Sequence, residues 1–229
     1  MSKPTVFFDL FETLVKVDRG YLEPYFDRET DRLGDLGQLP DAESTIWRLV
    51  TQTPHLADKG SVFEMAKYYE ARMQDSLMNP PQEVLDMLKA LKEAGCKLCV
   101  ISDAAKVDIM HWQESPLAQY FDDTVFSCDI GIVKPDAGLY RMAHQRMGHP
   151  TDMLYVGDGG HDELRGAHEF GMITAKAEWI NNRRLESIYQ YSNLRLQAPE
   201  QVVDIAKEME RLHDTPNRSN DEHPFEEVL

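Results

Sequence analysis

Short apolar runs alternate with amphipathic segments through the chain from residue 80 onward. The runs that are typical of buried strands are Lys97–Ser102, Thr124–Ser127, Met153–Gly157 and Met172–Ala175. The segments with apolar residues at helical spacing are Gln82–Ala94, Ala105–Trp112, Gly138–Met147, Glu163–Phe170 and Pro199–Leu212. Strands that alternate with helices of about ten residues predict right-handed βαβ units and a parallel sheet.

The N-terminal part of the chain has a different pattern. Val6–Phe8 is a short apolar run that predicts one more buried strand. No comparable run occurs from Lys16 to Asn79, where two helical patterns start at Glu43 and Ser61. We therefore predict an α/β fold, a Rossmann-like parallel sheet core flanked by helices, with an α-helical cap inserted after the first strand. The core would comprise residues 1–15 and 80–213, the cap 16–79, and an acidic, disordered tail 214–229.

Composition narrows the function classes. The 229 residues include 40 Asp and Glu against 24 Lys and Arg, which gives a formal net charge of −16. This acidity argues against nucleic-acid partners and anionic membrane surfaces, because both attract basic patches. The chain has no apolar stretch of about 18 residues, so no membrane span is expected. Cys96, Cys99 and Cys128 are too few for a disulfide scaffold, and we expect buried thiols in a cytoplasmic protein.

Polar residues follow several predicted strands, at the edge where parallel sheets bind ligands. They come from four separate regions of the chain: Asp9 and Thr13, Ser102 and Asp103, Lys134, and Asp158 and Asp162. Carboxylates of this kind hold Mg²⁺ through oxygen, and an Asp can attack phosphorus as a nucleophile. A Lys and small hydroxyls would bind phosphate oxygens. The set predicts chemistry on a small phosphorylated molecule.

These residues occur in an order that resembles the haloacid dehalogenase superfamily of hydrolases. The resemblance rests on Asp9-x-x-x-Thr13, a strand-ending Ser102, Gly131-x-x-Lys134-Pro135 and Gly157-Asp158-x-x-x-Asp162. It implies that Asp9 is the nucleophile, with Thr13, Ser102 and Lys134 as catalytic partners. It also implies that Ser102, Asp103 and Lys134 bind the substrate phosphate. Mg²⁺ would be held by Asp9, the backbone carbonyl of Phe11 and Asp158, and by Asp162 either directly or through water.

Phe11 departs from the pattern of the phosphatases in this superfamily. They usually carry a second Asp at this position, which protonates the leaving group and then activates water. Loss of such help typically costs about 10²–10⁴-fold in rate. The substrate could have a good leaving group, Glu12 or a cap residue could supply the proton, or the chain could be an inefficient phosphatase.

Two alternatives follow from the same residues. The dehalogenase branch also has an aromatic residue at the position of Phe11, so a metal-independent 2-haloacid dehalogenase is one alternative. Asp158 and Asp162 favour the phosphatase, because neighbouring buried carboxylates need a cation to ionise together. The other alternative is a non-catalytic binding protein. The identity of the substrate and the oligomeric state stay open at this stage.

Overall fold

The computed structural model of the 229-residue chain describes residues 3–26, 39–181 and 186–214. Its centre is a six-stranded sheet in the order β3-β2-β1-β4-β5-β6, and every neighbouring pair is parallel. The strands are β1 (Thr5–Phe8), β2 (Lys97–Ser102), β3 (Asp123–Phe126), β4 (Met153–Gly157), β5 (Ile173–Ala177) and β6 (Leu194–Leu196). This architecture confirms the predicted α/β class. The predicted tail lies outside the described residues from position 215 on.

The strand order reverses between β1 and β4. From β1 the chain continues to β2 and β3 on one side, then returns to β4 on the other side of β1. In open parallel sheets, ligands bind outside the carboxyl ends of the strands at such a reversal. The fold therefore marks the ends of β1 and β4 as the place to look for a site.

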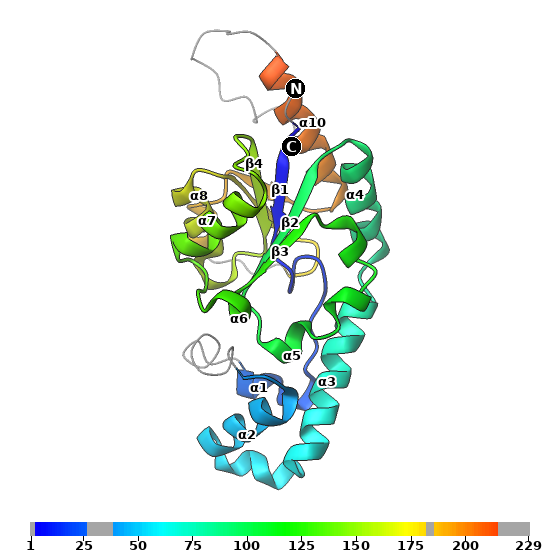
Figure 1. The fold of residues 1–229 in the computed structure, drawn as a ribbon, viewed down its shortest axis with the longest axis vertical. Coiled ribbons are helices and arrows are strands. Elements are labelled where there is room, and N and C mark those ends of the chain that lie inside the picture. Colours follow the sequence, from blue (N-terminus) through cyan, green and yellow to red (C-terminus); the bar gives the residue numbers. More distant parts are fainter. Residues whose placement is uncertain (1–2, 27–38, 182–185, 215–229) are drawn as a thin grey trace.

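Helices cover both faces of the sheet (Figure 1). The α-helices of the described residues are α1 (Glu23–Phe26), α2 (Ala42–Gln52), α3 (Val62–Met78), α4 (Gln82–Glu93), α5 (Lys106–Ile109), α6 (Ser127–Ile130), α7 (Ala137–Arg146), α8 (Glu163–Phe170), α9 (Glu186–Tyr189) and α10 (Glu200–Asp214). Short 3₁₀ turns cover Gly20–Leu22, Pro54–Lys59, Trp112–Glu114, Ala118–Tyr120 and Gly160–Asp162. Figure 1 shows α4 and α10 on one face of the sheet and α7 and α8 on the other.

The core follows from the alternation of side chains along each strand. Val6 and Phe8 of β1 pack with apolar residues of α4 and α10. Phe7 points to the opposite face and packs with residues of α7 and α8. Cys96 and Cys99 are divided between the same two clusters, which agrees with their interpretation as core thiols. Each fully buried large apolar side chain stabilises the fold by about 1.5–3 kcal/mol.

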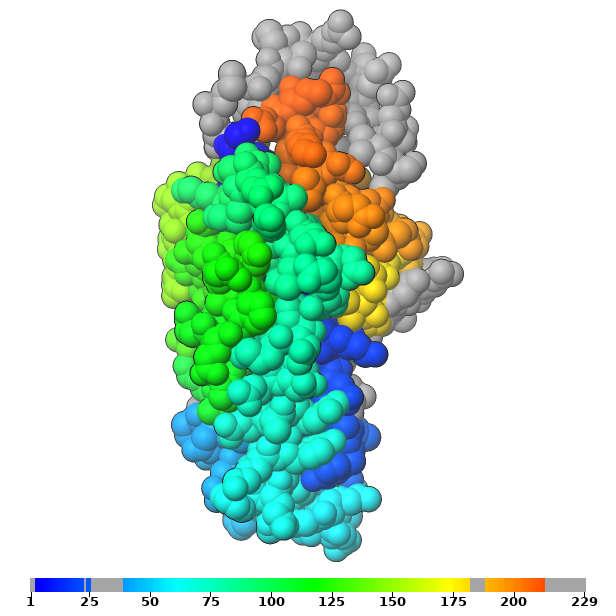
Figure 2. Space-filling view, turned by 90° about the vertical axis from the view of Figure 1, so that its right-hand side faces the viewer, coloured from blue at the N-terminus to red at the C-terminus, as the bar shows by residue number. Residues whose placement is uncertain are grey.

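Helices α1 to α3 lie beyond the carboxyl edge of the sheet (Figure 1). Their side chains form a third apolar cluster, with Ile46 and Leu49 of α2 against Met65 and Met73 of α3. Figure 2 shows α3, in cyan, and α4, in blue-green, along one side of the molecule. Helix α3 starts with the predicted capping box, in which Ser61 and Glu64 cap each other's backbone. The exact division into core and cap stays a prediction.

Two elements differ from the expectation. The predicted helix Ala105–Trp112 is only α5 followed by a 3₁₀ turn, because Trp112 turns into the core against Phe121 and Phe126. Strand β6 has three residues and lies at the edge of the sheet, too short for its pattern to be recognised. Within the described ranges, no helix combines the length and the apolar character needed to cross a membrane.

Candidate active site

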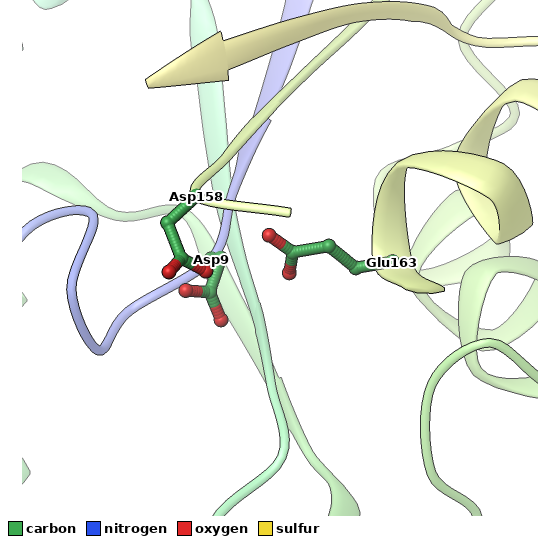
Figure 3. A group of neighbouring side chains, drawn as sticks. All are labelled: Asp9, Asp158 and Glu163. Atoms are coloured by element: carbon green, nitrogen blue, oxygen red, sulfur yellow. The ribbon is translucent and has the colours of Figure 1, made fainter. Parts of the chain in front are cut away.

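Two buried aspartates stand at the point where the strand order reverses. Asp9 follows β1 and Asp158 follows β4, and the two strands are neighbours in the sheet. The backbone N–H of Asp9 donates to the carbonyl of Val156 at 2.9 Å, so the pairing of β1 with β4 continues up to Asp9. Both carboxylates are almost completely buried. They lie together as the sequence predicts (Figure 3).

The third carboxylate of this cluster is Glu163. One oxygen from each of Asp9, Asp158 and Glu163 lies within 4.8 Å of the other two, and the three side chains point toward one another in Figure 3. The side chain of Asp162 is 65% exposed and faces Arg165, with Oδ2 3.3 Å from Nη2. The structure therefore does not bring Asp162 into the cluster. Glu163, the next residue, which the motif spacing does not select, lies in the cluster instead.

The backbone explains why Glu163 points inward. His161 and Asp162 both have left-handed conformations, with φ of 52° and 54°, just before α8 starts at Glu163. This tight turn places the first residue of α8 beneath the end of β4. Gly157 leaves the necessary room, since a Cβ on it would lie 2.2 Å from Oε1 of Glu163.

Hydrogen bonds fix the Glu163 carboxylate in this position. Its Oε1 accepts from the backbone N–H of Gly159 at 2.8 Å, and its Oε2 accepts from the hydroxyl of Tyr155 at 2.8 Å. The hydroxyl of Tyr140 donates to the Glu163 backbone carbonyl at 2.8 Å. Asp158 is held in a similar way, by the N–H of Gly160 at 2.9 Å and the amide of Asn181 at 3.1 Å. Nothing in the local sequence pattern singles out Tyr155 or Asn181, because their partners come from other elements.

Lys134 bridges two members of this cluster, Asp9 and Glu163. Its Nζ is 2.6 Å from Oδ1 of Asp9 and 2.6 Å from Oε2 of Glu163. Burial opposes the charge of the ammonium, but the two carboxylates outweigh that effect and raise the pKa of Lys134 well above its usual value. Lys134 is thus a permanent cation beside the proposed nucleophile, as the sequence predicts.

The carboxylates carry more negative charge than Lys134 can balance. Burial raises the pKa of Asp9, and the charge of Asp158 raises it further against the opposing effect of Lys134. Burial together with the charge of Asp9 raises the pKa of Glu163 to about 8. With all three carboxylates ionised, the cluster and Lys134 together would have a net charge of −2, which a divalent cation would balance. A buried set of oxygen donors with this charge fits a hard divalent cation such as Mg²⁺.

Thr13 and Ser102 are both fully buried next to this edge of the sheet. The Thr13 hydroxyl donates to Oδ2 of Asp9 at 3.1 Å, and Trp179 donates to the Thr13 carbonyl at 2.8 Å. Ser102 is the last residue of β2, the strand beside β1. Its hydroxyl lies 3.5 Å from the carbonyl oxygen of Asp103, a long contact that can give way to a better acceptor.

Asp103 does not join the carboxylate cluster. Its Oδ1 accepts from the backbone N–H of Lys134 at 3.0 Å, and its Oδ2 lies 3.3 Å from Nδ1 of His161. The side chain thereby holds the segment of Lys134 against the loop after β4. Its predicted contact with a substrate stays a prediction.

Phe11 and Glu12 occupy the turn after Asp9. The half-buried ring of Phe11 packs against both the core cluster and the cluster of α1 to α3. Glu12 has a left-handed backbone with φ of 63°, and its Oε1 accepts from the backbone N–H of Val17 at 2.9 Å. This contact directs Glu12 toward the chain that leads into the helical segment, and Phe11 itself provides no proton.

Comparison with known proteins identifies relatives among the phosphatases and among the 2-haloacid dehalogenases. The sequence profile of haloacid dehalogenase-like hydrolases matches residues 40–177. A glyceraldehyde 3-phosphate phosphatase of Methanocaldococcus jannaschii is 29% identical over 140 residues, which cover 59% of this chain and 60% of that protein. Pyrophosphatase PpaX of Halalkalibacterium halodurans is 29% identical over 181 residues, covering 76% of this chain and 83% of that one. (S)-2-haloacid dehalogenase 4A of Burkholderia cepacia is 26% identical over 215 residues, which cover 83% of this chain and 88% of that protein.

Solved structures share the fold. A crystal structure of an L-2-haloacid dehalogenase superposes with a TM-score of 0.69 at 18% identity. The superposition covers 90% of this chain and 100% of the dehalogenase. A phosphatase from Thermococcus onnurineus superposes with a TM-score of 0.60 at 18% identity, covering 88% and 97%. Since a phosphatase and a dehalogenase superpose at the same identity, the fold does not choose between the two activities.

Proposed function

Because the chain belongs to the haloacid dehalogenase-like hydrolase family, we propose that it is a Mg²⁺-dependent phosphatase of a small phosphorylated metabolite. The observation that carries this proposal is the buried cluster of Asp9, Asp158 and Glu163, with the Lys134 ammonium on two of the three carboxylates. A Mg²⁺-dependent phosphatase needs such a cation site, whereas in a metal-independent dehalogenase Lys134 alone would have to balance three buried carboxylates. No nucleic acid or membrane takes part in this proposal, and the cytoplasmic location stays a prediction.

Asp9, Asp158 and Glu163 would hold Mg²⁺, together with the backbone carbonyl of Phe11. In this assignment Glu163 replaces Asp162, whose carboxylate faces Arg165. When bound, Mg²⁺ neutralises charge on the carboxylates and on the phosphate oxygens. The remaining chemistry falls to the side chains of the chain.

Asp9 acts as the nucleophile. Lys134 and the Thr13 hydroxyl each bind one of its oxygens, so the carboxylate is oriented and the neighbouring ammonium favours its ionised form. An Asp9 oxygen forms a bond to phosphorus while the bond from phosphorus to the leaving oxygen breaks. Water then attacks the phosphorus of the aspartyl-phosphate and restores Asp9. Ser102 and Lys134 bind the phosphoryl oxygens during both steps.

Phe11 limits the substrates that such a site can use. Without an acid at this position, the leaving oxygen must depart as an anion or take its proton from solvent. Glu12 is already bound to the backbone N–H of Val17 and is a poor substitute. We therefore favour a substrate with a good leaving group, such as an acyl phosphate or a phosphoanhydride, over an alkyl phosphate.

A 2-haloacid dehalogenase is the second candidate. It is favoured by the aromatic Phe11 and by the similarity to (S)-2-haloacid dehalogenase 4A, which spans most of this chain. In that reaction Asp9 would attack carbon and displace halide, and Lys134 would bind the carboxylate of the substrate. A binding protein without turnover is a third possibility, with the same residues holding a phosphorylated ligand.

The three candidates differ in simple assays. Phosphate release from acetyl phosphate, p-nitrophenyl phosphate and glycerol 1-phosphate is measured with Mg²⁺ and with EDTA, for the native protein and for Asp9→Asn. The phosphatase proposal predicts release from the first two substrates only, and no release with EDTA or with Asp9→Asn. Halide release from 2-chloropropionate in EDTA would instead establish the dehalogenase. Mg²⁺ binding without either product would indicate a binding protein.

A further inference from the structure

Two histidines meet at the C-terminal end of α7, away from the proposed active site. Helix α7 begins just after Lys134 and Pro135 and runs away from the carboxyl edge of the sheet. Its far end lies at the amino edge, where Nζ of Lys97, the first residue of β2, is 3.4 Å from the Met147 carbonyl. His144 and His149 stand at this end, so the two sites occupy opposite edges of the sheet.

The backbone folds His149 back onto His144. Gly148 and His149 both have left-handed conformations, with φ of 81° and 59°, and the N–H of His149 donates to the His144 carbonyl at 2.9 Å. The two Nδ1 atoms lie 3.3 Å apart. The His144 ring packs against Phe170 of α8 in an edge-to-face arrangement, with ring centroids 5.6 Å apart. Phe170 therefore fixes the position of the His144 ring, while the exposed side chain of His149 has room to rotate.

The proton of the His144 ring is assigned by its second contact. Its Nε2 lies 3.2 Å from the backbone carbonyl of Pro150, which can only accept a hydrogen bond. Nε2 therefore carries the hydrogen, and Nδ1 of neutral His144 presents a lone pair toward His149. Histidines that ligate metals have the same arrangement, with the second ring nitrogen donating to a carbonyl or carboxylate.

We propose that His144 and His149 form a second metal site, which takes a late first-row divalent cation such as Zn²⁺ through the two Nδ1 atoms. Zn–N bonds of about 2.0–2.1 Å in tetrahedral geometry separate two ligand nitrogens by about 3.3 Å, which is the separation found here. Among the described residues, groups of three or more potential metal ligands occur only at the carboxylate cluster, so water completes the coordination. Imidazole pairs suit Zn²⁺, Cu²⁺ and Ni²⁺, whereas the carboxylate cluster suits Mg²⁺.

The proton balance is simple. In the neutral, metal-free pair, Nδ1–H of His149 donates to Nδ1 of His144. Binding replaces this hydrogen bond by two metal–nitrogen bonds, and the hydrogen of His149 moves from Nδ1 to Nε2. The exposed ring of His149 permits this change, because its Nε2–H can then be solvated.

The test uses the untagged 229-residue chain in excess Mg²⁺, which keeps the carboxylate cluster occupied. Zn²⁺ affinity is measured by calorimetry, and the electron paramagnetic resonance spectrum of added Cu²⁺ reports the number of bound nitrogens. His149→Asn is the main variant, because Asn tolerates a left-handed backbone and removes the ring nitrogen. His144→Gln removes the other ligand, and His168→Ala, an exposed histidine of α8, is the matched control.

We expect two nitrogens on Cu²⁺ in the native protein and in His168→Ala, and one or none in His149→Asn. Zn²⁺ affinity should fall by at least about tenfold in His149→Asn and in His144→Gln. Mutating a residue that only hydrogen-bonds to a metal ligand already costs about 10–100-fold in affinity, so losing a ligand should cost at least as much. Zn²⁺ should also raise the melting temperature of the native protein more than that of His149→Asn. Equal affinities in the native protein and both variants, or oxygen ligands alone on Cu²⁺, would overturn the proposal.

Discussion

Replacing Glu163 by Gln changes the charge of the carboxylate cluster with little change in shape. The amide can still accept a hydrogen bond from the N–H of Gly159, which now binds Oε1 at 2.8 Å. The substitution removes one of three carboxylates that each place an oxygen within 4.8 Å of the other two. Mg²⁺ would therefore lose one of its three side-chain ligands.

The size of the effect can be bounded. A carboxylate oxygen that ligates Mg²⁺ lies about 2.1 Å from it, where charges of −1 and +2 attract by about 16 kcal/mol at an effective dielectric constant of about 20. Water replaces most of this attraction when the carboxylate is lost, and partners outside the ligand shell alone are worth about 10–100-fold in affinity. We expect Glu163→Gln to weaken Mg²⁺ binding by about 100-fold, or about 2.8 kcal/mol.

The matched control is Asp162→Asn, which changes the adjacent acid. The Asp162 side chain is 65% exposed and pairs with Arg165 at the surface, and such pairs contribute about 0–1 kcal/mol. Mg²⁺ affinity is measured by calorimetry on protein dialysed against EDTA, and circular dichroism confirms that both variants are folded. If Asp162→Asn loses Mg²⁺ while Glu163→Gln binds it normally, the assignment of Glu163 to the metal site is wrong.

Three further changes test other parts of the account. Phe11→Asp restores a leaving-group acid and should raise hydrolysis of glycerol 1-phosphate by up to about 10²-fold relative to acetyl phosphate; an unchanged ratio of the two rates would refute the role given to Phe11. Gly157→Ala places a Cβ 2.2 Å from Oε1 of Glu163 and should lower the unfolding free energy by about 1–3 kcal/mol in urea titrations while weakening Mg²⁺ binding. Unchanged stability together with unchanged Mg²⁺ affinity would contradict the close contact between Gly157 and Glu163. Tyr69→Phe removes the buried hydroxyl that donates to Asp108 and should cost about 1–3 kcal/mol of unfolding free energy, whereas an unchanged melting temperature would show that this bond contributes little.

Part of the site could be predicted because the sequence pattern shows where the strands end. An apolar run that stops at a polar residue locates the residue at the sheet edge, as for Asp9, Ser102 and Asp158. Parallel strands then bring these residues to one edge whatever their separation in the chain. Lys134 was predicted from its motif, and the structure places its ammonium on Asp9.

The remainder depends on backbone geometry that a residue pattern does not encode. Motif spacing selected Asp162, but two successive left-handed residues rotate its side chain outward and turn Glu163 inward. Tyr155 reaches Glu163 only because β4 and the start of α8 are packed together. Asn181 reaches Asp158 across the ends of adjacent strands, which depends on the sheet order.

The most direct measurement of the central claim is label transfer to Asp9. The protein is mixed with ³²P-labelled acetyl phosphate and Mg²⁺, quenched in acid during turnover, digested and analysed by mass spectrometry. The account predicts a hydroxylamine-sensitive phosphoryl group on the peptide that contains Asp9, which is absent with EDTA and absent in Asp9→Asn. A native protein that acquires no label, yet releases chloride from 2-chloropropionate in EDTA, would contradict it.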